Sequence, residues 1–380
     1  MKRTSLTLAA LTFAATGCAG GPLNNLGSDY AALVIASYDD SITTAETLDA
    51  AVASFVTTPD AAGMTAAKNA WLAAREPYLQ TEVYRFYDGP IDDPTDGPEG
   101  LLNAWPLDEK YIDYVNGEVS GAFSGIVNDP TQSLDVTTLV GLNEAGGEKN
   151  IATGYHAVEF LLWGQDESST GPGTRPFGDY TTTENADRRG LYLELVSGLI
   201  VDHLNEVRSE WTEGGTYRNE WDGLDGTAAL ERILTGMIIL SGFETGGERL
   251  QAALSSGDQE DEHSCFSDNT HRDMVGDVQG VLNAWDGLYT RPDGSELSGV
   301  GVRDVVEVED ATLAAEVDAR LRESVVLAEA LQSPFDQEIA PGNAEGNARV
   351  QALVDSLRTQ EAVLFDVFTL FGLTVDIPTE

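Results

Sequence analysis

The chain has 380 residues, of which 42% are hydrophobic, and its 21 basic residues stand against 64 acidic ones for a formal net charge of −43. This length and apolar fraction suffice for one large hydrophobic core or two smaller ones, which excludes a disordered chain and a disulfide-stapled miniprotein. The charge argues against nucleic acid as a partner, because the phosphates would be repelled. An acid-rich, lysine-poor surface is also favoured in a saline habitat, since salt screens the self-repulsion.

The N-terminus resembles an export signal. A basic start precedes an apolar run from Leu6 to Ala15, and Ala15-Thr16-Gly17-Cys18 resembles a bacterial lipobox. Cleavage before Cys18 would remove residues 1–17 as a signal peptide and leave a lipidated cysteine, with residues 18–27 as a flexible tether. We therefore expect an exported protein, held by lipid in the bacterial cell envelope at the outer membrane and facing the periplasm.

Apolar residues recur at helical spacing through the rest of the chain, without the sustained alternation that would predict a strand. The principal predicted helices cover residues 30–56, 60–87, 184–211, 227–254, 273–289, 310–332 and 343–370. Four glycines inside residues 227–254 indicate close approach of another backbone or local unwinding, because glycine weakens a helix. The expected fold is all-α, with two packed helical-bundle domains.

A loop rich in glycine and proline at residues 165–180 suggests the junction between the bundles. The expected domains are therefore residues 28–170 and 171–380. Asn69-Ala70-Trp71 recurs as Asn283-Ala284-Trp285, which suggests a duplication, but Asn103-Ala104-Trp105 repeats the tripeptide in another context. The duplication stays an open alternative.

The stretch from Gly154 to Gly164 places two metal-competent side chains in an otherwise apolar helix. His156 and Glu159 are three residues apart, so they leave the same helix face and can share one ion. A buried carboxylate is costly unless it is paired or metal-bound. We therefore predict His156 and Glu159 as metal ligands, with further ligands supplied by other segments.

Two candidates for those further ligands precede this helix. Glu82 lies on an aromatic face of the helix predicted at residues 60–87, although ion pairing with a neighbouring arginine explains it equally well. Asp92 lies in the acidic loop at residues 88–100, whose spacing does not match an EF-hand. Glu244, in the glycine-containing helix, is a further carboxylate that can instead pair with Arg249.

Residues 259–271 hold two of the four histidines and the second cysteine, Cys265. Asp268 and His271 are the ligand candidates here, although Asp268 can instead cap the following helix. If Cys18 carries lipid, Cys265 has no partner for an intramolecular disulfide. His203, in the apolar stripe of the helix at residues 184–211, is interpreted as a core histidine without an acidic neighbour in phase.

Three segments together resemble the imelysin-like family. They are Gly154-x-His156-x-x-Glu159 with the following Phe160–Asp166, the stretch Trp71–Phe86, and Gln259–His271. The resemblance implies an all-helical fold of two related bundles, export, and a link to bacterial iron acquisition. Some members are named as metallopeptidases and others as metal-binding components of iron uptake. In the family the His-x-x-Glu pair is the proposed metal site, which here corresponds to His156 and Glu159.

The residues favour a metal-binding protein over an enzyme. The well-understood helical zinc peptidase motif, His-Glu-x-x-His, is absent from the sequence. A site rich in oxygen ligands with one or two imidazoles suits iron or manganese better than zinc, although zinc or copper could still bind, and iron is the metal we expect. The expected function is metal binding in iron uptake, with iron-transport components as partners. The alternatives are a metallopeptidase that uses Glu159 and a scaffold lipoprotein without catalysis.

Overall fold

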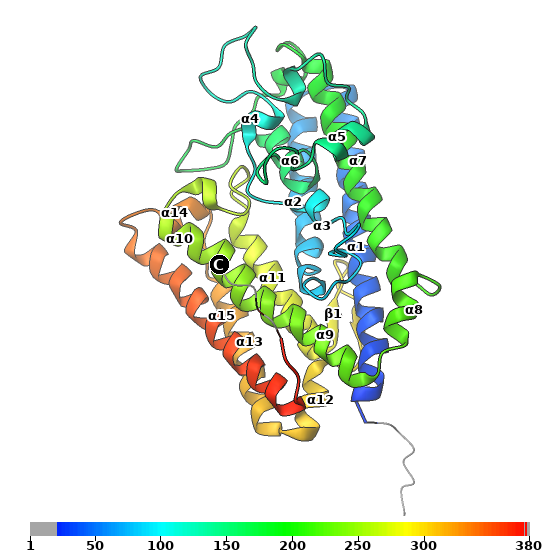
Figure 1. Ribbon diagram of the computed structural model, residues 1–380. Coiled ribbons are helices and arrows are strands. Elements are labelled where there is room, and N and C mark those ends of the chain that lie inside the picture. The colour runs from blue at the N-terminus through cyan, green and yellow to red at the C-terminus, as the bar shows by residue number, and fades with distance from the viewer. Residues whose placement is uncertain (1–20, 376, 378–380) are drawn as a thin grey trace, which may run out of the picture.

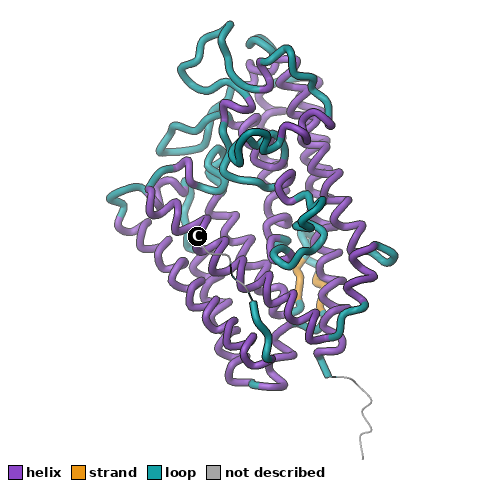
Figure 2. The backbone as a smooth tube through the Cα atoms, viewed as in Figure 1, coloured by secondary structure: helices purple, strands orange, loops and turns teal. Residues whose placement is uncertain are grey.

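The computed structural model describes residues 21–375 and 377, so the predicted signal peptide, its cleavage site and Cys18 lie outside the described residues. Helices and their connecting loops make up almost all of this part of the chain (Figures 1 and 2). The all-α prediction is confirmed. The helices form two packed groups, which meet along the interface that holds the candidate site.

The first group is built on two long helices. α1 (Leu23–Thr57) packs along α2 (Ala61–Leu79) and along α7 (Ala186–Trp211), and α6 (Gly154–Trp163) fills the space between α2 and α7 (Figure 1). Shorter elements connect or cover these helices: η1 (Glu82–Tyr84), α3 (Glu99–Leu102), α4 (Glu109–Ile112), η2 (Ile126–Asn128), α5 (Val136–Leu142), η3 (Phe177–Tyr180) and α8 (Thr216–Asp222).

The second group packs around the continuous helical stretch Gly226–Ser256. This stretch comprises α9 (Gly226–Ile238), the π-helical η4 (Ile239–Gln251) and α10 (Ala252–Ser256). The other elements of the group are η5 (Gln259–Asp261), α11 (Thr270–Asp286), α12 (Val302–Glu309), α13 (Ala311–Glu329), α14 (Phe335–Ile339) and α15 (Ala344–Phe371). Gly226–Ser256 is long and apolar enough to cross a membrane by composition, but 61% of its most apolar window is buried inside the fold, as in a core helix.

Two differences from the expected elements concern boundaries. α1 begins at Leu23, within the stretch expected to be a tether, and Pro22 occupies its N-cap. α7 follows the expected junction at residue 170 but packs along α1 in the first group, and the second group begins with α9. A third difference is an antiparallel hairpin of β1 (Leu288–Thr290) and β2 (Glu296–Ser298), where the sequence predicted a helix end and a loop.

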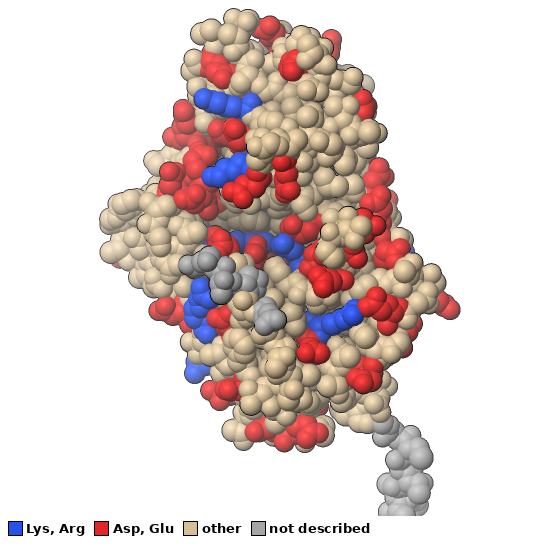
Figure 3. Space-filling view, in the orientation of Figure 1, with Lys and Arg blue, Asp and Glu red and all other residues tan. Residues whose placement is uncertain are grey.

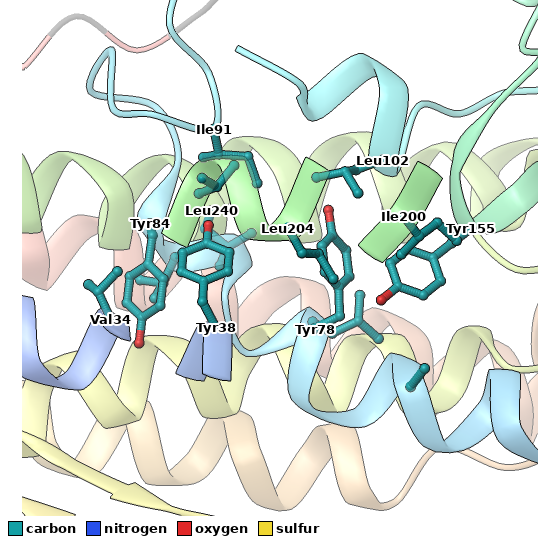
Figure 4. Close-up of a cluster of buried hydrophobic side chains, with 14 of the residues drawn as sticks. Val34, Tyr38, Tyr78, Tyr84, Ile91, Leu102, Tyr155, Ile200, Leu204 and Leu240 are labelled. Carbon is teal, nitrogen blue, oxygen red and sulfur yellow. The ribbon is translucent and has the colours of Figure 1, made fainter. Parts of the chain in front are cut away.

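The two groups share one hydrophobic core. Aromatic rings of Tyr38, Tyr78, Tyr84 and Tyr155 gather with Leu102, Ile200, Leu204 and Leu240, which come from both groups (Figure 4). Close backbone approach joins α2 to α11, since a Cβ on Gly280 would lie 2.5 Å from the carbonyl oxygen of Gln80. This interface fixes the N-terminal half of the site against the C-terminal half.

Candidate metal centre

Backbone geometry sets the start of α6. Gly154 has a φ of +85°, and a Cβ there would lie 2.5 Å from the carbonyl oxygen of Leu102 in α3. The Thr153 hydroxyl donates to the carbonyl of Leu101 at 3.0 Å. A glycine is therefore required where α6 meets α3, and the first turn of α6 carries His156 into the interface.

His156 and Glu159 contact each other, as the helical spacing predicted. The His156 Nδ1 and Glu159 Oε2 atoms lie 2.9 Å apart, and both side chains are fully buried. The other carboxylate oxygen, Oε1, accepts hydrogen bonds from the Ser267 backbone N–H at 2.9 Å and from its hydroxyl at 2.6 Å. Both oxygens of Glu159 are thus engaged within the protein, and they orient the His156 ring.

A second imidazole–carboxylate pair faces the first. His263 Nδ1 lies 2.7 Å from Asp273 Oδ2, and the rings of His156 and His263 are 4.9 Å apart between centroids, edge to face. Arg75 in α2 donates to Asp273 at 2.9 Å and to the Asn103 side-chain oxygen at 2.5 Å. Each histidine is therefore held through Nδ1 by a carboxylate from the protein, an arrangement typical of metal-ligating histidines.

The two carboxyl groups differ in charge at pH 7, because the pKa of Glu159 is raised and that of Asp273 is lowered. Burial raises the pKa of Glu159 to about 8 against the opposing hydrogen bond from Ser267, and burial together with the neighbouring His263 holds the pKa of His156 well below its usual range. Burial opposes ionisation of Asp273, but Arg75 outweighs it and lowers that pKa. Burial and Arg249 lower the pKa of His263 to about 4. Both imidazoles are therefore neutral at pH 7, the form that can ligate a metal.

The remaining ring nitrogens are the atoms available to an ion. His156 Nε2 is buried without any hydrogen-bond partner, a costly arrangement for a ring nitrogen. His263 lines a cavity of about 320 Å³ together with Asn103 and Trp105, and the Trp105 ring packs on His156 with centroids 4.9 Å apart. His156 thus lies directly behind two residues of the cavity wall.

Carboxylates and arginines line the rest of this cavity and its surroundings. Arg249, from η4, contacts Glu82 at 2.6 Å, Asp277 at 2.9 Å and Glu244 at 2.9 Å. The second oxygen of Glu82, Oε1, is buried without a partner, as is Oδ1 of Asp277. Glu82 was predicted as a ligand, and its Oε2 atom is already bound by Arg249 and Arg85, which both line the cavity.

Among the described residues, no hydrogen bond or ion pair joins the remaining predicted ligands, Asp92, Asp268 and His271, to His156. Asp92 closes its own loop by accepting hydrogen bonds from the backbone N–H groups of Phe86 and Gly89. Asp268 has a φ of +57°, and its backbone carbonyl lies 3.1 Å from Nδ1 of His271. Within residues 21–375 and 377, no group of three or more His, Cys, Asp or Glu side chains is arranged to hold a metal ion. The donor set fits a metal in chemistry, through two neutral imidazoles, but further ligands must come from solvent, a chelate or rearranged carboxylates.

Sequence reasoning missed His263, Asp273 and Ser267. All three lie in or next to the stretch 259–271 that the sequence singled out, but histidine spacing alone could not show that His263, rather than His271, faces α6. His203 is buried in α7, as predicted for a core histidine, but it does have an acidic neighbour in phase: its Nδ1 lies 3.0 Å from Oε2 of the exposed Glu206, so α7 carries a second His-x-x-Glu pair.

A family model described as Imelysin matches residues 34–364. The chain belongs to the imelysin family. It is 22% identical over 344 residues to the iron-regulated protein A of Synechococcus elongatus, a match that covers 86% of this chain and 82% of that protein.

Two solved structures share the fold of this chain. One is described as an iron-regulated protein A precursor from Parabacteroides distasonis, with a TM-score of 0.73 and 18% identity over 92% of this chain and 95% of that one. The other is an imelysin-like protein from Psychrobacter arcticum, with a TM-score of 0.63 and 12% identity over 94% of this chain and 97% of that one. These similarities show the fold and do not identify a bound metal or a reaction.

Proposed function

We propose that this protein binds iron through the Nε2 atoms of His156 and His263 and serves in iron uptake. One observation carries the proposal: two neutral imidazoles face each other, each held through Nδ1 by a carboxylate, and His156 Nε2 is buried without a partner. Carboxylate–imidazole pairs fix the tautomer and raise the basicity of a metal ligand, so binding of the ion at Nε2 would release the proton that Glu159 holds at neutral pH in the metal-free protein. In this arrangement Glu159 orients His156, and its two oxygens need not contact the ion.

The choice of iron rests on the mixed donors and on the relatives. His263 shares the cavity wall with Glu99 and Glu244, so imidazole nitrogen and carboxylate oxygen are available there without thiolate, which suits iron, while zinc or copper could compete for the site. Similar proteins from Synechococcus and Parabacteroides are named iron-regulated protein A, which supports a connection with iron.

Binding is favoured over peptide hydrolysis by the state of Glu159. A metallopeptidase needs a general base that can reach a metal-bound water. Here Oε2 of Glu159 contacts His156 and Oε1 accepts two hydrogen bonds from Ser267, so neither oxygen is directed to solvent. Metal-dependent cleavage of an unfolded protein that is lost in Glu159→Gln would reverse this preference.

The metal content of chelator-treated and reloaded protein tests the proposal. We expect the parent to take up one iron per chain, and His156→Ala and His263→Ala each to weaken that binding by at least about tenfold, as loss of one direct ligand should. His203→Ala is the matched control, because His203 belongs to the second His-x-x-Glu pair and lies outside the interface. Unchanged binding in both site variants, or equal loss in the control, would refute the proposal.

We also propose that the chain is exported and anchored by lipid at Cys18, where it would pass iron to transport components in the envelope. The apolar N-terminal run before Ala15-Thr16-Gly17-Cys18 supports this location. Mass spectrometry of the mature N-terminus should find a lipidated Cys18, and Cys18→Ser should release the protein from membranes. An unprocessed N-terminus would contradict the anchor.

A further inference from the structure

Four buried carboxylates gather on the side of the C-terminal group next to α14. They come from three segments: Asp166 from the loop after α6, Glu262 and Asp268 from the loop between η5 and α11, and Asp336 from α14. Their exposed fractions are 3%, 0%, 4% and 7%, respectively. The Gln337 side chain donates to the carbonyl of Ser169 at 2.6 Å, and the Gln259 side chain donates to the carbonyl of Asp166, so hydrogen bonds tie the three segments together.

These carboxylates lack the positive partners that the rest of the protein supplies. Among the described residues, every other buried Asp or Glu except Glu109 contacts an arginine or a histidine. No ion pair in that part of the chain involves any member of the four. Burying a carboxylate without a compensating charge is costly, and burying several side by side adds their mutual repulsion.

Unsatisfied oxygens mark where a positive charge is missing. Both oxygens of Glu262 are buried without any hydrogen-bond partner, and the same holds for Oδ2 of Asp166, Oδ2 of Asp268 and Oδ1 of Asp336. Burial, with repulsion from the neighbouring carboxylates, raises the pKa of Asp166 to about 6 and that of Asp268 to about 7. Glu262, fully enclosed, lies close enough to Asp336, Asp268 and Asp166 for their charges to act on it.

We propose that Asp166, Glu262, Asp268 and Asp336 form a second cation site, which takes Ca²⁺ and is distinct from the His156 site. Only oxygen donors are present, and several carboxylates around a hard divalent cation are what calcium prefers. The side chains do not yet enclose an ion, so binding would draw the carboxylates together and replace their repulsion by attraction. The ion would join the loop after α6, the loop before α11 and α14.

Such an ion would also stabilise the iron site indirectly. Glu262 precedes His263, and Asp268 follows Ser267, which holds Glu159. Calcium would therefore fix the loop that carries one proposed iron ligand and the residue that orients the other. The proposed role is structural, and calcium binding does not require an intact His156.

Calorimetric titration of the chelator-treated full chain with CaCl₂ tests the proposal, in about 0.5 M NaCl to suppress non-specific binding to the acidic surface. We expect one site with a Kd between about 1 µM and 1 mM, and a melting temperature that rises with Ca²⁺. Glu262→Gln and Asp336→Asn should each weaken binding by at least about tenfold, whereas Asp261→Asn, an exposed neighbour with the same charge change, should bind as the parent does.

Two further readouts separate a cation site from a merely polar core. Without Ca²⁺, Glu262→Gln should melt at a higher temperature than the parent, because it removes a buried carboxyl group that only the ion would satisfy. His156→Ala should keep its Ca²⁺ affinity. Absence of saturable binding by the folded parent, or equal affinities in the Glu262→Gln, Asp336→Asn and Asp261→Asn variants, would overturn the proposal.

Discussion

Glu159 has two oxygens, and the protein uses both to hold its neighbours in place. The pair with His156 and the bonds from Ser267 are all buried, so the carboxyl is protonated more readily than a free one, with a pKa of about 8. Its folded pKa is raised above the unfolded value, so the native state holds a proton that the unfolded state has lost between about pH 4.5 and 8.

The free energy of unfolding should therefore decrease as the pH rises, because of the Glu159 carboxyl group. In metal-free protein, we expect the unfolding free energy of the parent, relative to that of Glu159→Gln, to decrease by about 1.4 kcal/mol per pH unit between about pH 5 and 8 and to level off above pH 8. Urea unfolding of both proteins across this range measures the difference. Parallel profiles would show that Glu159 keeps an ordinary pKa in the folded protein.

Gly154 is the second residue on which the site depends. Gly154→Ala should destabilise the protein by roughly 2–5 kcal/mol, because it combines a φ of +85° with a collision against the Leu102 carbonyl. Gly171→Ala is the control, since a Cβ there meets nothing within 4 Å. Equal stability of the two variants would mean that the start of α6 adapts to a side chain.

For single residues, helical spacing in the sequence predicted contacts within one helix, but it could not predict contacts between distant segments. The three-residue interval predicted that His156 and Glu159 would meet, because both lie on one helix. The pairing of His263 with Asp273 depends on how the loop at residues 259–269 folds back on α11, which no periodicity encodes. For the same reason the sequence could name Asp268 and His271 as candidates but could not place them.

Among the elements, η4 connects the two halves of the site. Its π-helical backbone includes Gly242, where a Cβ would meet the movable carboxylate end of Glu361 on α15. η4 also presents Arg249 to carboxylates from η1 and α11. π-helical turns are often found at functional sites, and here one directs a cation into the interface.

Removing the Arg249 side chain should strongly destabilise the protein. Arg249→Leu leaves Glu82 and Asp277 buried without their shared partner, and we expect a loss of about 3–5 kcal/mol in unfolding free energy. Arg358→Leu removes an arginine from a half-exposed pair with Glu361 and should cost no more than about 1 kcal/mol. Similar losses in denaturant unfolding would show that Arg249 does not balance the buried carboxylates.

Element types were predicted better than their ends. Long amphipathic patterns predicted α1, α7, α13 and α15, while the predicted second helix is divided into α2 and η1 by a turn after Leu79. The π-helical geometry of η4 and the hairpin at residues 288–298 depend on contacts with other segments. Glycines within residues 227–254 did signal close approach, as at Gly236, where a Cβ would lie 2.2 Å from the Val83 carbonyl.

For the molecule as a whole, charge is the dominant surface property. Acidic side chains spread over the face shown in Figure 3, with fewer basic ones between them, and the net charge is −43. We expect the melting temperature to rise clearly between about 0.05 and 1 M NaCl, because salt screens this self-repulsion. A melting temperature that is unchanged or falls would show that the acidic surface carries no salt requirement.

The two helical groups each supply half of the proposed iron site. His156 and Glu159 come from α6 in the first group, and His263, Ser267 and Asp273 come from the loop after η5 and from α11 in the second. The two-bundle architecture could be predicted from helical periodicity, but the packing of α2 on α11, which brings the two imidazoles together, could not. The proposed iron site therefore exists only where the two helical groups meet.

The position of the iron can be located in a crystal structure of the iron-loaded protein, with anomalous scattering measured on both sides of the iron absorption edge. We expect one strong iron peak within bonding distance of Nε2 of both His156 and His263, with Glu159 still bound to Ser267. A peak that lies elsewhere, or one bound by Glu159 without His263, would contradict it.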